Sequence, residues 1–128
     1  MKNDLDDIKK KIERLAELIQ APEHLLPSVG GPSKETDVFL DSSGYLCYGT
    51  NDWRNTNSVI CYDEDDLLFR VFNTITWIMA HQYAKENKNE NEDFSNLCFN
   101  KQAELLGKLN IEWSARFKKK REIWRRSS

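Results

Sequence analysis

The sequence predicts an α+β fold, in which a small antiparallel β-meander of about three strands packs against three or four α-helices. Apolar residues recur every three or four positions near the N-terminus and again through the second half, which is the period of an amphipathic helix. Between these regions lie short β-prone runs separated by turn sequences. The length of 128 residues, with 39% hydrophobic and 31% charged residues, fits one folded domain over 1–128.

The first helix is expected within residues 1–20. Lys and Glu occupy most of its surface, and its apolar stripe consists of Leu5, Ile8, Ile12, Leu15 and Ile19. The stripe could dock on the protein's own core, which is favoured for a helix of this length, or it could pair with a second copy in a homodimer. A connector over 21–36 follows, because Pro and Gly residues interrupt it repeatedly.

Residues 37–62 are expected to form the β-meander. Two β-prone runs, Val38–Leu40 and Tyr45–Tyr48, flank the turn sequence DSSG. The segment TNDWRNTN predicts a second turn, and SVICY predicts a third strand. Three consecutive strands joined by short turns form an antiparallel sheet.

Residues 63–126 are expected to be helical. The spacing of apolar side chains predicts a long central helix from about Glu64 to Lys85, followed by the polar loop ENKNENED. Asp93 can cap a second helix that stops at Gly107. Asn110 can cap a last helix, whose aromatic side is formed by Trp113, Phe117 and Trp124.

Four consecutive carboxylates open the central helix, namely Asp63, Glu64, Asp65 and Asp66. Negative charge in a first turn suits the positive end of the helix dipole, and Asp63 is a good N-cap. One cap and one or two acids would be enough for that purpose, so the surplus could also face a basic partner. A metal site or a catalytic carboxylate pair is least favoured, because calcium loops alternate their acids around a glycine and catalytic pairs face across a cleft.

Two further segments allow two interpretations each. Asp52, Trp53 and Arg54 lie in a predicted turn, where a tryptophan between charges is either a lid on the core or an interface anchor. The C-terminus is rich in Lys and Arg and could follow the phosphates of a nucleic acid, which makes a nucleic-acid-associated regulator the alternative function. The net charge of −2 argues against a nucleic-acid partner and favours a solvated basic helix end.

The sequence offers little for catalysis, cofactors or membranes. No recognisable catalytic motif or phosphate-binding loop is present, so we expect no enzyme, no metal and no cofactor. No apolar run is long enough for a membrane span, and the N-terminus has no apolar signal-peptide core, which indicates the cytoplasm. The odd number and wide spacing of the three cysteines favour small buried side chains over disulfides or zinc ligands; they are Cys47, Cys61 and Cys98.

Three segments of the second half form a specific pattern. The first, D-x-D-x-L-L-Y/F, is matched by Asp63, Asp65, Leu67, Leu68 and Phe69. The second, A-x-x-Y, is matched by Ala80 and Tyr83. The third is D-F-R-R-x-x-F-x-x-Q-x-x-L-L-x-x-L with an aromatic residue shortly after it. Its matches are Asp93, Phe94, Phe99, Gln102, Leu105, Leu106, Leu109 and Trp113. Over roughly Gly44 to Trp124 the chain thereby resembles the immunity protein 63 family of bacterial polymorphic toxin systems. It departs from that family at Ser95 and Asn96, where an arginine pair is expected.

The resemblance implies a cytoplasmic protein that binds a cognate toxin domain tightly and blocks it, as a stoichiometric inhibitor in contact-dependent competition between bacteria. We expect the interface to include the turn Asp52–Arg54 and the acidic helix start Asp63–Asp66, because opposite charges speed the encounter with a basic toxin surface. Five of the family-matched residues are expected to be structural, namely Asp93, Phe94, Gln102, Leu105 and Trp113.

Overall fold

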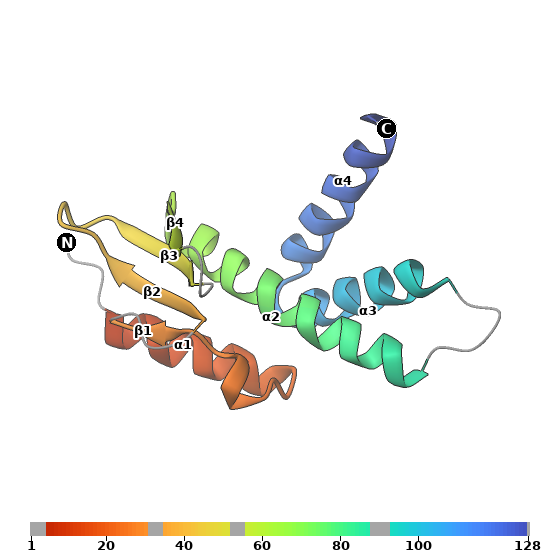
Figure 1. Ribbon diagram of the computed structural model, residues 1–128, viewed down its shortest axis with the longest axis horizontal. Helices are drawn as coiled ribbons and strands as arrows, with labels where there is room; N and C mark the ends of the chain where they lie inside the picture. The colour runs from red at the N-terminus through yellow and green to blue at the C-terminus, as the bar shows by residue number, and fades with distance from the viewer. Residues whose placement is uncertain (1–4, 31–34, 52–55, 88–92, 128) are drawn as a thin grey trace. The chain divides into compact units, whose positions relative to one another are not determined.

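The computed structural model describes residues 5–30, 35–51, 56–87 and 93–127, and it confirms the α+β class (Figure 1). Within these ranges the chain forms one helix, a short 3-10 turn, a four-stranded sheet and then three helices. It divides into two compact units, residues 1–72 and residues 73–128. The single-domain organisation expected from the length stays a prediction.

In the first unit, helix α1 spans Leu5–Leu18 and lies beside strand β1 (Figure 1). The predicted stripe is largely buried, and its most buried members are Ile8 and Ile12. The helix ends in a Schellman motif, in which Gln20 has a φ of 55° and the Ala21 N–H donates to the Ala16 carbonyl at 2.9 Å. The stripe therefore docks on its own unit, as favoured from the sequence, and the homodimer stays a prediction.

The connector prediction was wrong in one respect, because residues 21–36 also contain a short strand. A 3-10 turn, η1, spans Glu23–Leu25, and β1 spans Ser28–Val29 and pairs in parallel with β2. A two-residue strand is too short to show a period-2 pattern, so only its pairing with β2 defines it.

The sheet has the order β1-β2-β3-β4. Strands β2 (Thr36–Leu40), β3 (Leu46–Asn51) and β4 (Thr56–Ile60) are antiparallel neighbours, which confirms the predicted three-strand meander, and β1 makes the sheet mixed. At the DSSG turn, the Asp41 carboxylate accepts hydrogen bonds from the N–H groups of Ser43 and Tyr45, both at 2.9 Å. Gly44 there has a φ of 85°, which favours glycine.

Gly49 on β3 marks a close approach between two strands. It lies opposite Asp37 on β2, whose side chain is only 3% exposed. A Cβ added at Gly49 would overlap the Asp37 carboxylate. A side chain at position 49 would have to displace the buried carboxylate.

Helix α2 spans Glu64–Asn87, close to the predicted range. In the first unit it buries Leu67, Phe69 and Val71, and in the second it buries Ile75, Thr76, Ala80 and Ala84. Ile78, Gln82 and Tyr83 continue the helical spacing of the apolar residues, but their side chains are exposed. The alanines at positions 80 and 84 extend the buried face instead, and small side chains gave no strong periodic signal.

The second unit adds α3 (Phe94–Leu109) and α4 (Ile111–Ser127). Both predicted caps are confirmed, since Asp93 accepts from the Ser95 N–H and Asn110 accepts from the Glu112 N–H, each at 2.9 Å. The prediction that α3 stops at Gly107 was wrong, because the helix continues to Leu109. Gly107 lies instead where α4 approaches α3, with Ser114 Cβ 3.7 Å from the position of an added Cβ.

Buried side chains hold α4 against α3. Trp113 and Ser114 of α4 are 3% and 7% exposed, and the Ser114 hydroxyl donates to the Ala103 carbonyl of α3 at 2.9 Å. Within the described ranges, no helix is long and apolar enough to cross a membrane.

Candidate partner-binding surface

Two carboxylates of the acidic start of α2 accept backbone hydrogen bonds and cap the helix. Asp63 accepts a hydrogen bond from the Asp66 N–H at 2.8 Å, and Asp66 accepts one from the Tyr62 N–H, also at 2.8 Å. Two N–H groups at the helix start are thereby satisfied by side chains. The capping role inferred from the sequence is confirmed by this geometry.

Glu64 and Asp66 also form ion pairs. Glu64 accepts from the Lys11 ammonium of α1 at 2.6 Å, and Asp66 accepts from the Arg70 guanidinium at 3.1 Å. Asp63 and Asp65 are both exposed to solvent, and no Lys or Arg lies between Arg54 and Arg70 in the sequence. With four carboxylates and no Lys or Arg over residues 55–69, this segment carries a local excess of negative charge.

Tyr62 is held by this cap while its side chain faces solvent. The hydrogen bond from its N–H to Asp66 fixes the backbone, and the Tyr62 side chain is 92% exposed. A large aromatic side chain on a fixed backbone loses little conformational freedom on binding, which is why such residues anchor interfaces.

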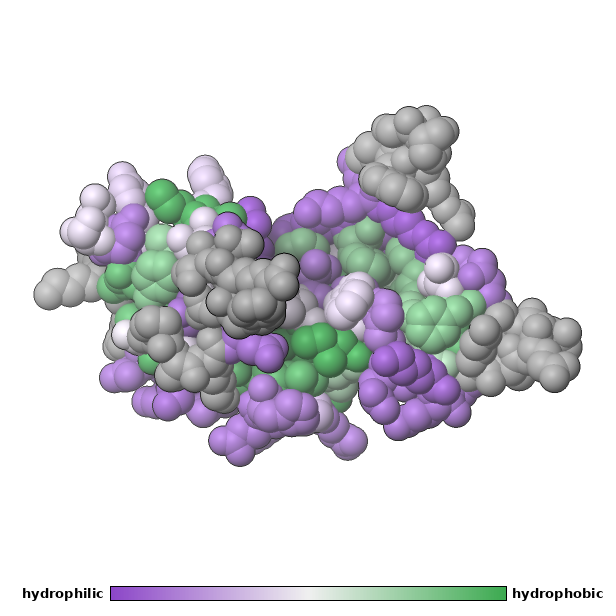
Figure 2. Space-filling view, in the orientation of Figure 1, coloured by the Kyte–Doolittle hydropathy of each residue, from purple (hydrophilic) through white to green (hydrophobic). Residues whose placement is uncertain are grey.

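Strand β4 differs sharply from its neighbour β3 in exposure. Residues 46–49 of β3 are buried on both faces of the sheet, whereas residues 57–60 of β4 are exposed on both faces. Val59 is 43% exposed and Ile60 is 60% exposed. Figure 2 shows hydrophobic side chains at the surface in the region where Figure 1 draws β4.

A second exposed aromatic residue extends this area. Tyr45, 59% exposed, directly precedes Leu46, whose carbonyl accepts from the Cys61 N–H at 2.8 Å. Tyr45 therefore lies at the same end of the β3–β4 pair as Tyr62, which directly follows Cys61. The β4–α2 surface, as we name it, comprises Tyr45, Val59, Ile60, Tyr62 and Asp65.

The sequence prediction and this surface overlap only in part. Of the acidic residues Asp63–Asp66, Asp65 belongs to the surface and the others adjoin it in sequence, whereas Asp52, Trp53 and Arg54 lie outside the described residues. Sequence reasoning missed Val59, Ile60 and Tyr62, because it took SVICY as an ordinary sheet strand. The available signal was the apolar run ending directly at four acids, but only the strand order shows that β4 is an edge.

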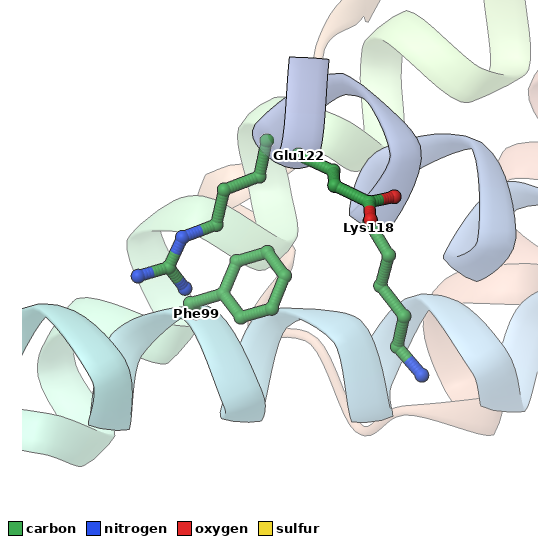
Figure 3. A pocket seen from close by; sticks show the side chains of 4 residues that line it. Phe99, Lys118 and Glu122 are labelled. Atoms are coloured by element: carbon green, nitrogen blue, oxygen red, sulfur yellow. The ribbon is translucent and has the colours of Figure 1, made fainter. Parts of the chain in front are cut away.

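Part of the basic C-terminus is used in packing between α3 and α4. The rings of Phe99 and Phe117 stack with their centroids 5.0 Å apart, and the Arg121 guanidinium lies 3.9 Å from the Phe99 centroid. Arg121 also donates to Asn96 at 2.9 Å. Figure 3 shows the hollow beside Phe99, which Lys118 and Glu122 of α4 also line. The guanidinium of Arg121 is thus committed to α3, although a nucleic-acid role for the other cations stays untested.

The cysteines are free and buried, which confirms the interpretation from their spacing. Burial raises the pKa of the Cys61 thiol to about 11, and the nearby Asp66 carboxylate adds to the increase. A thiol with a raised pKa is protonated and unreactive near neutral pH. Among the described residues, no group of three or more His, Cys, Asp or Glu side chains could hold a metal ion.

The raised pKa of Cys61 predicts a loss of stability in alkali. The ordinary thiol pKa is 9.0 and the folded value is about 11, so between these pH values the unfolded chain has lost the proton that the folded chain keeps. The stabilising contribution is complete below pH 9 and falls as the pH rises toward 11. Denaturant unfolding at pH 8 and pH 10.5 should therefore show a larger drop for the wild type than for Cys61→Ala. Equal drops would contradict the assignment.

An exposed aromatic and apolar surface beside excess negative charge is typical of a protein–protein interface. The β4–α2 surface is therefore a candidate surface for binding another protein. The sequence model of immunity protein 63 matches residues 45–123, from the residue before β3 into α4, and the chain belongs to the immunity protein 63 family. No curated protein and no solved structure matches the chain.

Proposed function

We propose that this chain is a cytoplasmic immunity protein that binds and neutralises one cognate bacterial toxin domain through tight protein–protein contact. It acts as a stoichiometric inhibitor and not as an enzyme. Its membership of the immunity protein 63 family carries the proposal. The β4–α2 surface supports it, because the surface combines the two properties that such an interface needs.

The first property is negative charge at the border of the surface. Asp63 and Asp65 would attract a basic toxin face and increase the association rate, an effect that salt screens. The second property is exposed apolar and aromatic area, chiefly at Ile60 and Tyr62. Burial of such side chains away from water slows dissociation. The predicted turn Asp52–Arg54 is included in the proposed interface.

Charge reversal at one exposed acid tests the proposal. We expect Asp65→Lys to lower the association rate constant for the toxin domain by about tenfold at low salt, with little change in melting temperature. The probe is a catalytically inactive form of the cognate toxin domain, which the proposal expects in the reading frame next to that of this chain. Stopped-flow or surface plasmon resonance at two salt concentrations measures the rate.

Two control variants separate charge from folding. Glu112→Lys makes the same charge change at an exposed first-turn position of α4 and should leave association unchanged. Asp63→Ala removes the cap and should lower the free energy of unfolding by about 0.5–2 kcal/mol. If Asp65→Lys lowers the melting temperature but not the association rate, the acids serve only the helix start. If the wild type neither binds that toxin domain nor protects cells that express it, the proposed function is wrong.

A further inference from the structure

Among the strands that the described residues form, β4 is the outer one at the end of the sheet opposite β1. An edge strand presents N–H and C=O groups on the side that faces no neighbour. Proteins commonly protect such edges with lysine, proline or a bulge. The described part of β4 carries none of these, and it exposes Val59 and Ile60 instead.

The register identifies which backbone groups face outward. The Cys61 N–H donates to the Leu46 carbonyl at 2.8 Å, directly beyond the pairs Cys47–Ile60 and Tyr48–Val59. In an antiparallel pair, residues alternate between those bonded to the neighbouring strand and those directed away from it. Asn57 and Val59 therefore share the inward direction of Cys61, and the N–H and C=O groups of Ser58 and Ile60 point away from β3.

The side chains indicate the chemistry of an occupant. The stretch from Asn57 to Phe69 contains four carboxylates and no Lys or Arg, and Asp63 and Asp65 are exposed. A strand added to β4 would end or begin beside this negative charge. It would also cover Ile60 on one face of the sheet and Val59 on the other, since neighbouring residues alternate.

We infer that an extended, positively charged segment of the toxin pairs with β4 and becomes the fifth strand of the sheet. Main-chain hydrogen bonds to Ser58 and Ile60 supply affinity, apolar side chains of the segment pack on Val59 and Ile60, and its cations face Asp63 and Asp65. This inference rests on the proposed function, and it specifies how the toxin is bound.

Amide hydrogen exchange tests the inference directly. In the free protein, the outward N–H groups of Ser58 and Ile60 should exchange fast and that of Val59 slowly. In the complex with the inactive cognate toxin domain, exchange at Ser58 and Ile60 should slow at least tenfold, whereas Val59 should change little. Residue-resolved exchange by NMR on the labelled immunity protein gives these rates.

A proline substitution provides a second, independent measurement. Ser58→Pro removes an outward N–H that β3 does not use, which an edge strand tolerates, and it should weaken toxin binding about tenfold or more. Ser58→Ala, the matched control, keeps the N–H and should bind as the wild type does. The melting temperature of each variant shows whether the fold is retained.

The outcomes separate the two proposals. A stable complex in which Ser58 and Ile60 exchange as fast as in the free protein overturns strand addition and leaves toxin neutralisation standing. Equal binding by Ser58→Pro and Ser58→Ala does the same. Failure of the wild type to form any complex overturns both.

Discussion

Replacing Trp113 with alanine is expected to lower the free energy of unfolding by about 3–5 kcal/mol. The Trp113 side chain is 3% exposed on α4, at the level where Gly107 and Ser114 bring α3 and α4 together. Removing the indole takes away a large buried apolar area and leaves a cavity that two helices in close contact cannot easily fill. Denaturant unfolding followed by far-UV circular dichroism measures the loss, since the signal does not depend on the missing tryptophan.

Ile111→Ala is the matched control for this variant. Ile111 lies two residues earlier on the same helix but is 79% exposed, so its truncation should change stability by no more than about 0.5 kcal/mol. Similar effects of the two substitutions would show that Trp113 does not anchor the second unit. Toxin affinity of the folded Trp113→Ala fraction should be unchanged, because the residue is assigned to structure.

Gln102→Glu is expected to destabilise the protein by about 2–4 kcal/mol at pH 7. Gln102 of α3 is 4% exposed, and its amide nitrogen points at three oxygens of α2: the Asn73 carbonyl at 3.0 Å, the Thr76 hydroxyl at 3.2 Å and the Asn73 side-chain oxygen at 3.3 Å. A carboxylate would replace this donor with a charged acceptor. The three α2 oxygens would lose this donor and face a negative charge.

The loss from Gln102→Glu should depend on pH in a defined direction. Burial among acceptors disfavours the charged form, so the pKa of the new carboxyl is expected to lie above its unfolded value of about 4.3. The folded chain then holds a proton that the unfolded chain has released, and stability falls as the pH rises above about 4.3. Unfolding midpoints at pH 4 and pH 7, each compared with the wild type, should show the smaller difference at pH 4.

Gln102→Met controls for the hydrogen bonds alone. It keeps the length of the side chain without charge, and it should cost about 1–3 kcal/mol at both pH values. If Gln102→Glu shows the same pH-independent cost as Gln102→Met, the carboxyl does not meet the α2 oxygens.

Local signals were sufficient for most of the secondary structure. Asp93 and Asn110 are N-cap residues by chemistry, and each accepts the hydrogen bond that a cap should accept. The DSSG turn and the acidic start of α2 could be predicted equally well, because their hydrogen bonds join residues only a few positions apart in the chain. Gly107 misled the prediction of a helix end because a glycine also occurs where two helices approach each other, and sequence does not distinguish the two cases.

Only part of the candidate surface could be predicted from the sequence, because the exposure of a strand residue depends on its neighbours in the sheet. The acids Asp63–Asp66 were found because charge is visible in the sequence itself. Tyr62 and Ile60 were missed, because an apolar residue in a strand is buried or exposed according to its neighbours in the sheet. Cys47 and Ile60 lie side by side in register, yet one is 3% exposed and the other 60%.

The sequence by itself determined the order of helices and strands, the caps, the acidic cluster and the family pattern, because each depends on residues close together in the chain. Only the tertiary structure decided that β1 joins the sheet, that Gly107 serves helix packing, and that β4 is an edge with outward-facing backbone groups. Those features depend on which distant segments meet. Which segments come into contact is decided by the packing of the whole unit, and it cannot be inferred from any single segment.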